Sequence, residues 1–136
     1  MNAFDSDVLI FAAKPGHPFG ARIRSLFAAA PDVPAGLGSL ILLTEVLSKP
    51  MRTEDHGQLA SLNDLLSRLE LLPLDLPTAD LAAALAAVYR LKAADAVHLA
   101  TAVNAGADRF ITNNQRDFPK SISEIEIVYP EDLEAA

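Results

Sequence analysis

Residues 3–11 read AFDSDVLIF, a short apolar run that Asp5 and Asp7 interrupt. We interpret its first part as a strand that ends near Asp5. Residues 109–112, RFIT, predict a second short strand, which the polar loop NNQRD follows. Both strands end at polar or acidic residues, and in open parallel sheets ligands bind beyond the carboxyl ends of the strands. These two stretches therefore predict the type of sheet and the edge at which a site should lie.

The rest of the chain alternates between helical and strand patterns. Five segments have helical patterns, over residues 18–30, 40–48, 54–68, 78–90 and 93–105. Short apolar runs predict further strands over residues 33–38, 69–75 and 125–129. Strands that alternate with helices predict an α/β fold. We expect a three-layer sandwich in which helices flank a central parallel sheet of about four or five strands.

Particular residues are expected to set the helix boundaries. Pro31 should stop the first helix and Pro50 the second, because proline lacks the backbone N–H of the helical ladder. Ser39 is expected to cap the amino end of the second helix, and Gly106 should stop the last one. Because the chain has no internal repeat, low-complexity segment or linker, residues 1–136 are expected to form a single domain.

The composition narrows the kinds of site. The 136 residues include no cysteine, which excludes disulfides, zinc thiolates and a cysteine nucleophile. The net charge of −7 argues against broad, non-specific nucleic-acid binding, although metal ions on carboxylates can reverse the charge where a phosphate binds. The amino terminus lacks a basic leader, and no stretch approaches the roughly 20 apolar residues of a membrane helix. We expect a soluble, cytoplasmic protein that does not contact a membrane.

Acids occur in apolar surroundings at four places, namely Asp5 with Asp7, Glu45, Asp95, and the 114–117 loop. A carboxylate is costly to bury unless it is paired or bound to a metal ion. Mg²⁺ prefers oxygen ligands, and an ion held by carboxylates can activate water against a phosphodiester. Each acid alone has an ordinary explanation, as a cap of a helix or turn or, for Glu45, as a partner of Lys49. Together, in an α/β pattern, they favour a metal-dependent site.

Four motifs carry these acids. The chain opens with DSDVLI at residues 5–10, and Ser39 precedes Glu45 in the second motif. The third motif is ADAVHLATA at residues 94–102, and the fourth is FITNNQRDF at residues 110–118. In content and order these motifs resemble those of the PIN-domain family, especially the VapC-type toxins of toxin–antitoxin pairs. The resemblance spans most of the chain.

This resemblance implies a PIN-like fold and a ribonuclease that cleaves single-stranded RNA with Mg²⁺ or Mn²⁺. The expected catalytic acids are Asp5, Glu45, Asp95 and Asp117. Asp5 and Asp95 should bind the ion directly, and Glu45 should bind it or hold a water of its shell. His98, one turn after Asp95, is a possible general base, but its Ala- and Leu-rich surroundings favour a packed supporting residue.

The supporting residues expected around these acids are Asp7, Thr112, Asn114 and Ser39. Thr112 should hydrogen-bond Asp5 or a water of the ion's shell, and Asp7 should either support the site or cap a turn. Asn114 stands where many relatives carry a fourth acid. Either Asp117 supplies that charge or the site uses three acids. The sequence is therefore consistent with one bound metal ion or with two.

Two other functions fit parts of the sequence. FDSDVLI, residues 4–10, could open a phosphatase of the haloacid-dehalogenase type, but the later acidic pair of that family is missing. A PIN-like module without metal could instead bind RNA or a protein, and Asn114 is consistent with that alternative. Retention of Asp5, Glu45 and Asp95 favours the nuclease.

The resemblance also implies macromolecular partners. RNA is the expected substrate, and a cognate antitoxin is expected to insert an apolar helix into a groove beside residues 19–27 and 59–69. A homodimer is consistent with the family. Basic residues available for RNA contacts are Lys14, Arg52, Arg90, Lys92 and Arg116, most of which we expect to be ordinary solvated charges.

Overall fold

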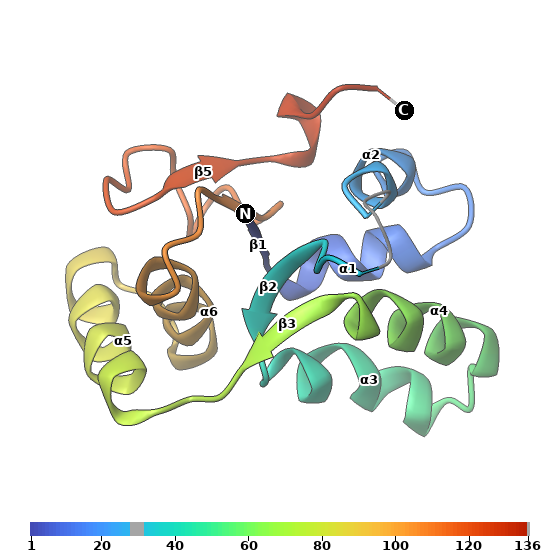
Figure 1. Cartoon of the computed structure of the whole chain (residues 1–136), viewed down its shortest axis with the longest axis horizontal. Helices are drawn as coiled ribbons and strands as arrows, with labels where there is room; N and C mark the ends of the chain where they lie inside the picture. Colours follow the sequence, from blue (N-terminus) through green and yellow to red (C-terminus); the bar gives the residue numbers. More distant parts are fainter. Residues whose placement is uncertain (28–31, 136) are drawn as a thin grey trace.

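The computed structural model describes residues 1–27 and 32–135, and these form a five-stranded parallel sheet between helices (Figure 1). The elements are β1 (Asn2–Phe4), α1 (Ser6–Ala13), α2 (Gly20–Ser25), β2 (Gly36–Ser39), α3 (Leu42–Arg52), α4 (His56–Ser67), β3 (Leu69–Leu72), α5 (Leu76–Tyr89), α6 (Ala93–Asn104), β4 (Arg109–Ile111), β5 (Glu126–Val128) and the 3₁₀ helix η1 (Pro130–Asp132). The predicted α/β fold and number of strands are confirmed.

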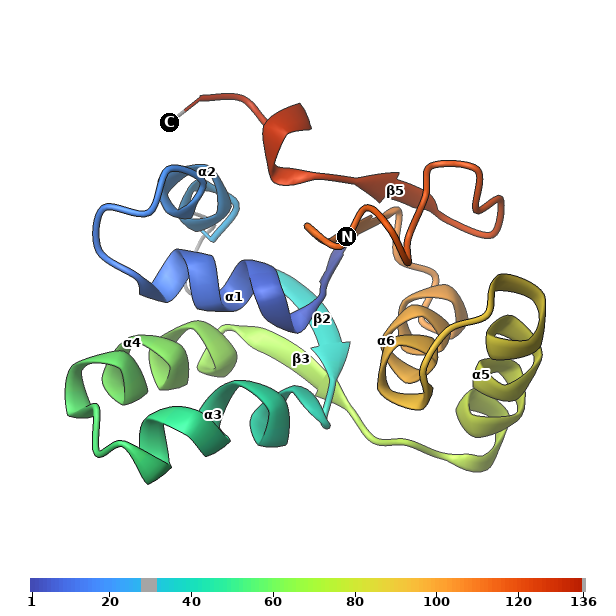
Figure 2. The same cartoon turned by 180° about the vertical axis from the view of Figure 1, so that it is seen from behind.

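Side chains alternate between two hydrophobic cores, one on each face of the sheet. Phe4 and Ile111 point to the face covered by α1, α2, α3 and α4. Their neighbours Ala3 and Phe110 point to the opposite face, which α5 and α6 cover. This alternation follows from the two-residue period of a strand, and Figure 2 shows the two helical layers on either side of the sheet.

The strand order β3-β2-β1-β4-β5 places a switch point between β1 and β4. From β1 the chain builds outward through β2 to β3, and then crosses to the other side of β1 to add β4 and β5. Adjacent connections therefore leave the sheet in opposite directions at β1 and β4, and a crevice at the carboxyl ends is the usual consequence. Asp5 follows β1 and Thr112 follows β4, so both residues lie at this point.

Helix α1 was missing from the sequence prediction. Residues 8–13, VLIFAA, are apolar without interruption, so no helical stripe distinguishes them from a strand. Beyond Ser6 and Asp7 the helix is apolar on every side, and Val8, Leu9, Ala12 and Ala13 are buried beneath other elements. Its amino end is capped by Asp5, whose carboxylate accepts a hydrogen bond from the Ser6 amide.

The predicted boundaries of α3 were wrong at both ends. Ser39 is the last residue of β2 rather than the N-cap, and α3 begins at Leu42 after Ile41. Pro50 lies inside the helix, which continues to Arg52. The proline removes one ladder hydrogen bond near the final turn, and it is itself buried with Val46 and Leu47. Packing of the last turn therefore outweighs the loss.

The remaining predicted elements are present with shifted ends. The predicted 18–30 helix corresponds to α2, which is shorter, and residues 28–30 and Pro31 of that prediction lie outside the described residues. Gly106 follows α6 with a positive φ of 72°, as expected of a glycine stop. In the described ranges, the helices are all too short or too polar to cross a bilayer.

Candidate active site

Asp5 lies at the centre of the site, between the carboxyl ends of β1 and β4. Its side chain is buried, with the residue only 4% exposed. One carboxylate oxygen, Oδ1, accepts from the Ser6 amide at 2.8 Å. The other, Oδ2, accepts from Thr112 Oγ1 at 2.7 Å, which is one of the two contacts expected of Thr112. Both oxygens are thus held in fixed directions by residues of α1 and the β4 end.

Glu45 reaches the site from the first turn of α3. Its Oε1 contacts Nε2 of His98 on α6, and its side chain remains 32% exposed. Glu45 therefore pairs with His98 and not with Lys49, the surface partner considered from the sequence. The pair spans the carboxyl edge of the sheet, because α3 and α6 cover opposite faces (Figure 2).

Asp95 reaches the site from the first turn of α6 and is half-buried. Burial raises the pKa of its carboxyl, and the charges of Asp5, Asp117 and Glu45 raise that pKa further. Coulomb repulsion weakens as the distance between two charges grows, so groups that shift one another's pKa lie near each other. The four predicted catalytic acids therefore share one neighbourhood, although they come from four separate segments of the chain.

Asp7 lies next to this cluster and supports the 112–117 loop. Its Oδ2 accepts from the Asn113 amide at 3.1 Å. Burial raises its pKa to about 7, and the charge of Asp5 adds to the effect. The buried Oδ1 atom finds no hydrogen-bond partner within the described part of the chain. Asp7 therefore links β1 and α1 to the loop, and retains an unused acceptor.

Asn114 and Asp117 form a local pair at the rim. Asn114 Nδ2 donates to Asp117 Oδ2 at 2.9 Å, and the Asp117 amide donates back to Asn114 Oδ1 at 3.3 Å. The hydrogen bond from Asn114 lowers the pKa of Asp117. The backbone N–H of Asn114 also donates to Thr112 Oγ1 at 3.1 Å. Asn114 thus holds Asp117 beside the cluster without adding a charge.

Ser39 occupies a different position from the other predicted supporting residues. It is buried at the carboxyl end of β2, and its hydroxyl accepts from the Ile41 amide at 3.3 Å. This contact shapes the turn between β2 and α3. Through that turn Ser39 helps to set the start of the helix that carries Glu45.

Burial and mutual charge leave the central carboxylates poorly compensated. Desolvation raises the pKa of Asp5, and Glu45 adds a smaller increase against the lowering effects of His98 and Thr112. Burial opposes protonation of His98, but the hydrogen bond to Glu45 and the surrounding carboxylates raise its pKa overall. The positive ends of α1, α3 and α6 point toward the acids in their first turns, which offsets part of the negative charge.

The donor set is chemically suited to a hard cation. Carboxylate oxygens dominate it, and Asp7 Oδ1 is a buried acceptor without a hydrogen-bond partner among the described residues. Within residues 1–27 and 32–135, no three Asp, Glu or His side chains are arranged so that together they could hold a metal ion. Mg²⁺ commonly retains several waters and takes only one or two protein carboxylates directly, so its binding does not need such a preformed cage.

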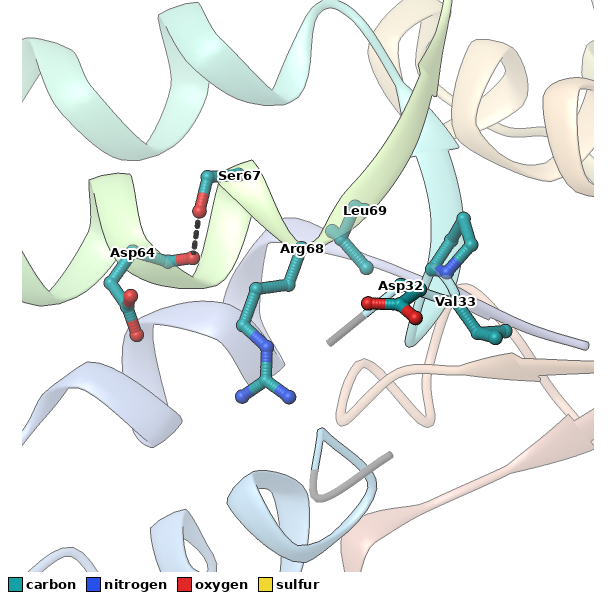
Figure 3. Close-up of a pocket in the computed structure, with 7 residues that line it drawn as sticks. Asp32, Val33, Asp64, Ser67, Arg68 and Leu69 are labelled. Carbon is teal, nitrogen blue, oxygen red and sulfur yellow. Dashed lines mark hydrogen bonds between the residues drawn. The ribbon is translucent and has the colours of Figure 1, made fainter. Parts of the chain in front are cut away.

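A separate hollow lies at the opposite edge of the sheet, and Figure 3 shows it. It is lined by Asp32, Val33, Pro34, Asp64, Ser67, Arg68 and Leu69. They come from the segment before β2, from the end of α4 and from the start of β3, and therefore border the amino ends of these two strands. The predicted catalytic and supporting residues do not line this hollow, so it is distinct from the candidate active site.

Known proteins with this architecture occur among toxin–antitoxin complexes. The chain superposes on a structure of a toxin–antitoxin complex from Klebsiella pneumoniae with a TM-score of 0.74 and 28% identity, covering 96% of this chain and 98% of that one. For DNA-bound VapBC from Salmonella typhimurium the TM-score is 0.75 and the identity 24%, and the match covers 95% of this chain and 97% of that one. For VapBC2 from Rickettsia felis, bound to a fragment of promoter DNA, the TM-score is 0.72 and the identity 18%, and the match covers 94% of this chain and 97% of that one.

The sequence itself identifies the family. No curated protein sequence matches the chain. The family model described as the PIN domain matches residues 3–121, a range that contains Asp5, Glu45, Asp95 and Asp117. The match covers most of the chain, and the architecture agrees with it. The chain belongs to the PIN domain family.

Proposed function

We propose that this protein is a metal-dependent endoribonuclease that cleaves single-stranded RNA. The observation that carries the proposal is the gathering of Asp5, Glu45, Asp95 and Asp117 around the switch point of the sheet, on segments joined by the contacts described above. Burial first, and then the charges of the other three acids, raise the pKa of Asp95. Membership of a family whose members are typically nucleases supports the same conclusion. A phosphatase of the haloacid-dehalogenase type loses its support, because the family match assigns the opening motif to a PIN domain.

Asp5 and Asp95 are the proposed direct ligands of Mg²⁺ or Mn²⁺, with Glu45 as a third ligand or as the holder of a water in the ion's shell. When bound, such an ion neutralises charge on the phosphodiester and activates water for attack. The ordinary oxygen preference of both ions fits this donor set.

The protein's own residues would orient and balance the charges. Thr112 fixes the direction of the Asp5 carboxylate through its hydroxyl. Asn114 holds Asp117 at the rim. Without a cation, the cluster would repel a phosphate group, so RNA cleavage should depend strictly on a divalent metal.

We further propose that the biological role is that of a toxin controlled by an antitoxin. The Klebsiella pneumoniae neighbour was solved as a toxin–antitoxin complex, and the two chains match over nearly their whole lengths. The expected antitoxin segment is an apolar helix that lies beside α2 and α4. A co-purification assay with the protein encoded beside this one tests the role, with loss of binding expected for Leu59→Asp on α4.

A metal-free binding module is the second candidate, and Asn114 is the observation that favours it. Its amide stands where many relatives carry an acid, and it is already engaged by Asp117. Such a module would bind RNA or a protein without cutting RNA. The cleavage experiment below distinguishes it from the nuclease.

The decisive assay compares cleavage of a mixed single-stranded RNA by the wild type and Asp5→Asn in Mg²⁺, Mn²⁺ and EDTA. Asparagine retains an oxygen for the α1 cap, so the variant should fold. Asp64→Asn, the same chemical change at the opposite edge, is the matched control. We expect cleavage by the wild type and the control in either metal, and none by Asp5→Asn or in EDTA. RNA binding without cleavage by folded wild-type protein would favour the binding module.

A further inference from the structure

His98 is a buried polar residue in direct contact with the acidic cluster. It lies on α6 one turn after Asp95 and is only 2% exposed. Its Nε2 contacts Glu45 Oε1, although the two residues lie 53 positions apart. The contact joins α6 to α3 past the carboxyl edge of the sheet, where these helices cover opposite faces (Figure 1).

Glu45 needs an external contact to stay in the site. Its long side chain has several rotamers and is partly exposed, so fixing it has an entropic cost. The like charges of Asp5 and Asp95 oppose its approach to the cluster. Lys49, one turn further along α3, would attract it outward. A donor on the buried side offsets these effects and favours the inward position of the carboxylate.

Burial of an imidazole is costly unless hydrogen bonds compensate. The other ring nitrogen, Nδ1, has no hydrogen-bond partner in the part of the chain that the structure describes. The contact with Glu45 is thus the polar interaction that the ring gains there. An apolar side chain of similar size could fill the same space without leaving a buried nitrogen unpaired.

We propose that His98 is a positioning residue that holds the Glu45 carboxylate in its orientation for the metal ion and the RNA. This inference rests on the proposed function and assigns His98 a role within that site. Partners of this kind, which orient a metal ligand from behind, typically change metal affinity or activity by about 10- to 100-fold when removed.

The test measures Mn²⁺ affinity by calorimetry, so that it does not depend on RNA cleavage. His98→Leu removes the donor and is expected to weaken Mn²⁺ binding by about 10- to 100-fold. His98→Gln, whose side-chain amide can donate to Glu45, should retain affinity within a few-fold. Thr101→Val is the matched control, since Thr101 is similarly buried on α6 but its hydroxyl donates to the Val97 carbonyl and, among the described residues, contacts no acid of the site. Its affinity should equal that of the wild type.

A double-mutant cycle separates positioning from packing. In a Glu45→Ala background, His98→Leu should cause little further loss of Mn²⁺ affinity, because the residue that it positions is absent. If His98→Leu fails to fold, His98→Asn replaces it as a shorter polar side chain that does not reach Glu45. Circular dichroism establishes folding for each variant.

The outcomes distinguish this inference from the nuclease proposal. Wild-type affinity in folded His98→Leu, or losses that simply add in the cycle, would overturn the positioning role and leave the nuclease intact. Mn²⁺ binding that follows the predicted pattern without any RNA cleavage would overturn the nuclease and support the positioning role. Absence of Mn²⁺ binding by the wild type would overturn both.

Discussion

Two groups of acids in this molecule differ in how their charge is compensated. On the surface, Asp108 contacts the amino terminus and Asp132 contacts Lys120 at 2.7 Å. Hydrogen bonds from these cations lower the pKa of both carboxyls. In the site, burial raises the pKa of Asp5 and Asp95, and neighbouring carboxylates raise it further.

The comparison shows which carboxylates are neutralised by cations of the protein itself and which are not. A cation beside an exposed acid gives a small stabilisation and leaves the group ionised. The site carries several acids in a small volume, with His98 and three helix amino ends as partial compensation. Groups that stay under-compensated in this way commonly mark functional sites. The uncompensated negative charge here is what the divalent cation proposed above would neutralise on binding.

Removing a central acid should give the largest effect. Asp95→Asn is expected to reduce RNA cleavage by about 100- to 1,000-fold, because it removes a proposed direct ligand and its charge. Single-turnover assays in Mg²⁺ measure the change. Asp132→Asn, a surface acid of the first group, should cleave at the wild-type rate. Near-normal cleavage by Asp95→Asn would break the distinction between the two groups.

The two groups should also respond oppositely to pH. A carboxyl whose pKa is raised on folding holds a proton that the unfolded chain releases, so stability falls as pH rises between the two pKa values. For Asp7 this window runs from about 4 to about 7, and Asp5 and Asp95 act in the same direction. Metal-free protein should therefore lose stability from pH 5 to pH 7.5 in urea titrations.

Variants sharpen this pH comparison. Asp7→Asn should flatten the decline, because the titrating group is removed. Asp132 has a lowered pKa, so its contribution is present above about pH 4 and is lost as pH falls through the folded value. Asp132→Asn should therefore lower stability at pH 7 and leave the decline unchanged. A wild-type curve that rises across this range would contradict the account.

Adding a charge at the rim should give an intermediate effect. Asn114→Asp replaces the donor to Asp117 with a like charge and is expected to destabilise the metal-free protein by about 1 kcal/mol. The same change should strengthen Mn²⁺ binding, because it adds a further carboxylate beside the four acids of the site. Urea titrations with and without Mn²⁺ measure both effects. Asn63→Asp, on the exposed surface of α4, should change neither quantity, and equal behaviour of the two variants would exclude Asn114 from the site.

The smallest effect is expected from Lys92. The hydrogen bond from Asn114 is the main cause of the lowered pKa of Asp117, and the charge of the exposed Lys92 adds a smaller lowering, so Lys92 lies near the acidic cluster. If it contacts one phosphate, Lys92→Gln should reduce the salt slope of single-stranded RNA binding by about 0.7. Fluorescence anisotropy in the Asp5→Asn background measures binding without cleavage. Lys49→Gln is the control, and an unchanged slope for Lys92→Gln would remove Lys92 from the RNA surface.

Most of the fold could be predicted because local patterns and tertiary packing agree. The alternation of strands and helices predicted the parallel sheet, and the sheet rule placed Asp5 and Thr112 at one edge. Helix α1 escaped prediction because it is apolar on all sides. The predicted helix end at Pro50 was wrong because burial of the last turn of α3 outweighs the cost of the lost backbone hydrogen bond.

The sequence predicted that the candidate acids lie together, but it did not predict the individual contacts among the side chains of the candidate site. The acids stood out because they occur in apolar surroundings, and the spacing of Asp95 and His98 placed both on one side of a helix. The contact between His98 and Glu45 joins two helices far apart in sequence, and no local pattern specifies such a meeting. The pairing of Asn114 with Asp117 is local, but side-chain type alone does not determine its geometry.

The most direct test of the central claim is anomalous diffraction at the manganese edge from crystals of the wild-type protein soaked in Mn²⁺. The account predicts an anomalous peak at the carboxyl edge of the sheet, within ligand distance of Asp5 and Asp95 and close to Glu45. Well-occupied Mn²⁺ bound only elsewhere, or none at all under conditions in which the protein cleaves RNA, would contradict the claim that these acids form a metal-dependent active site.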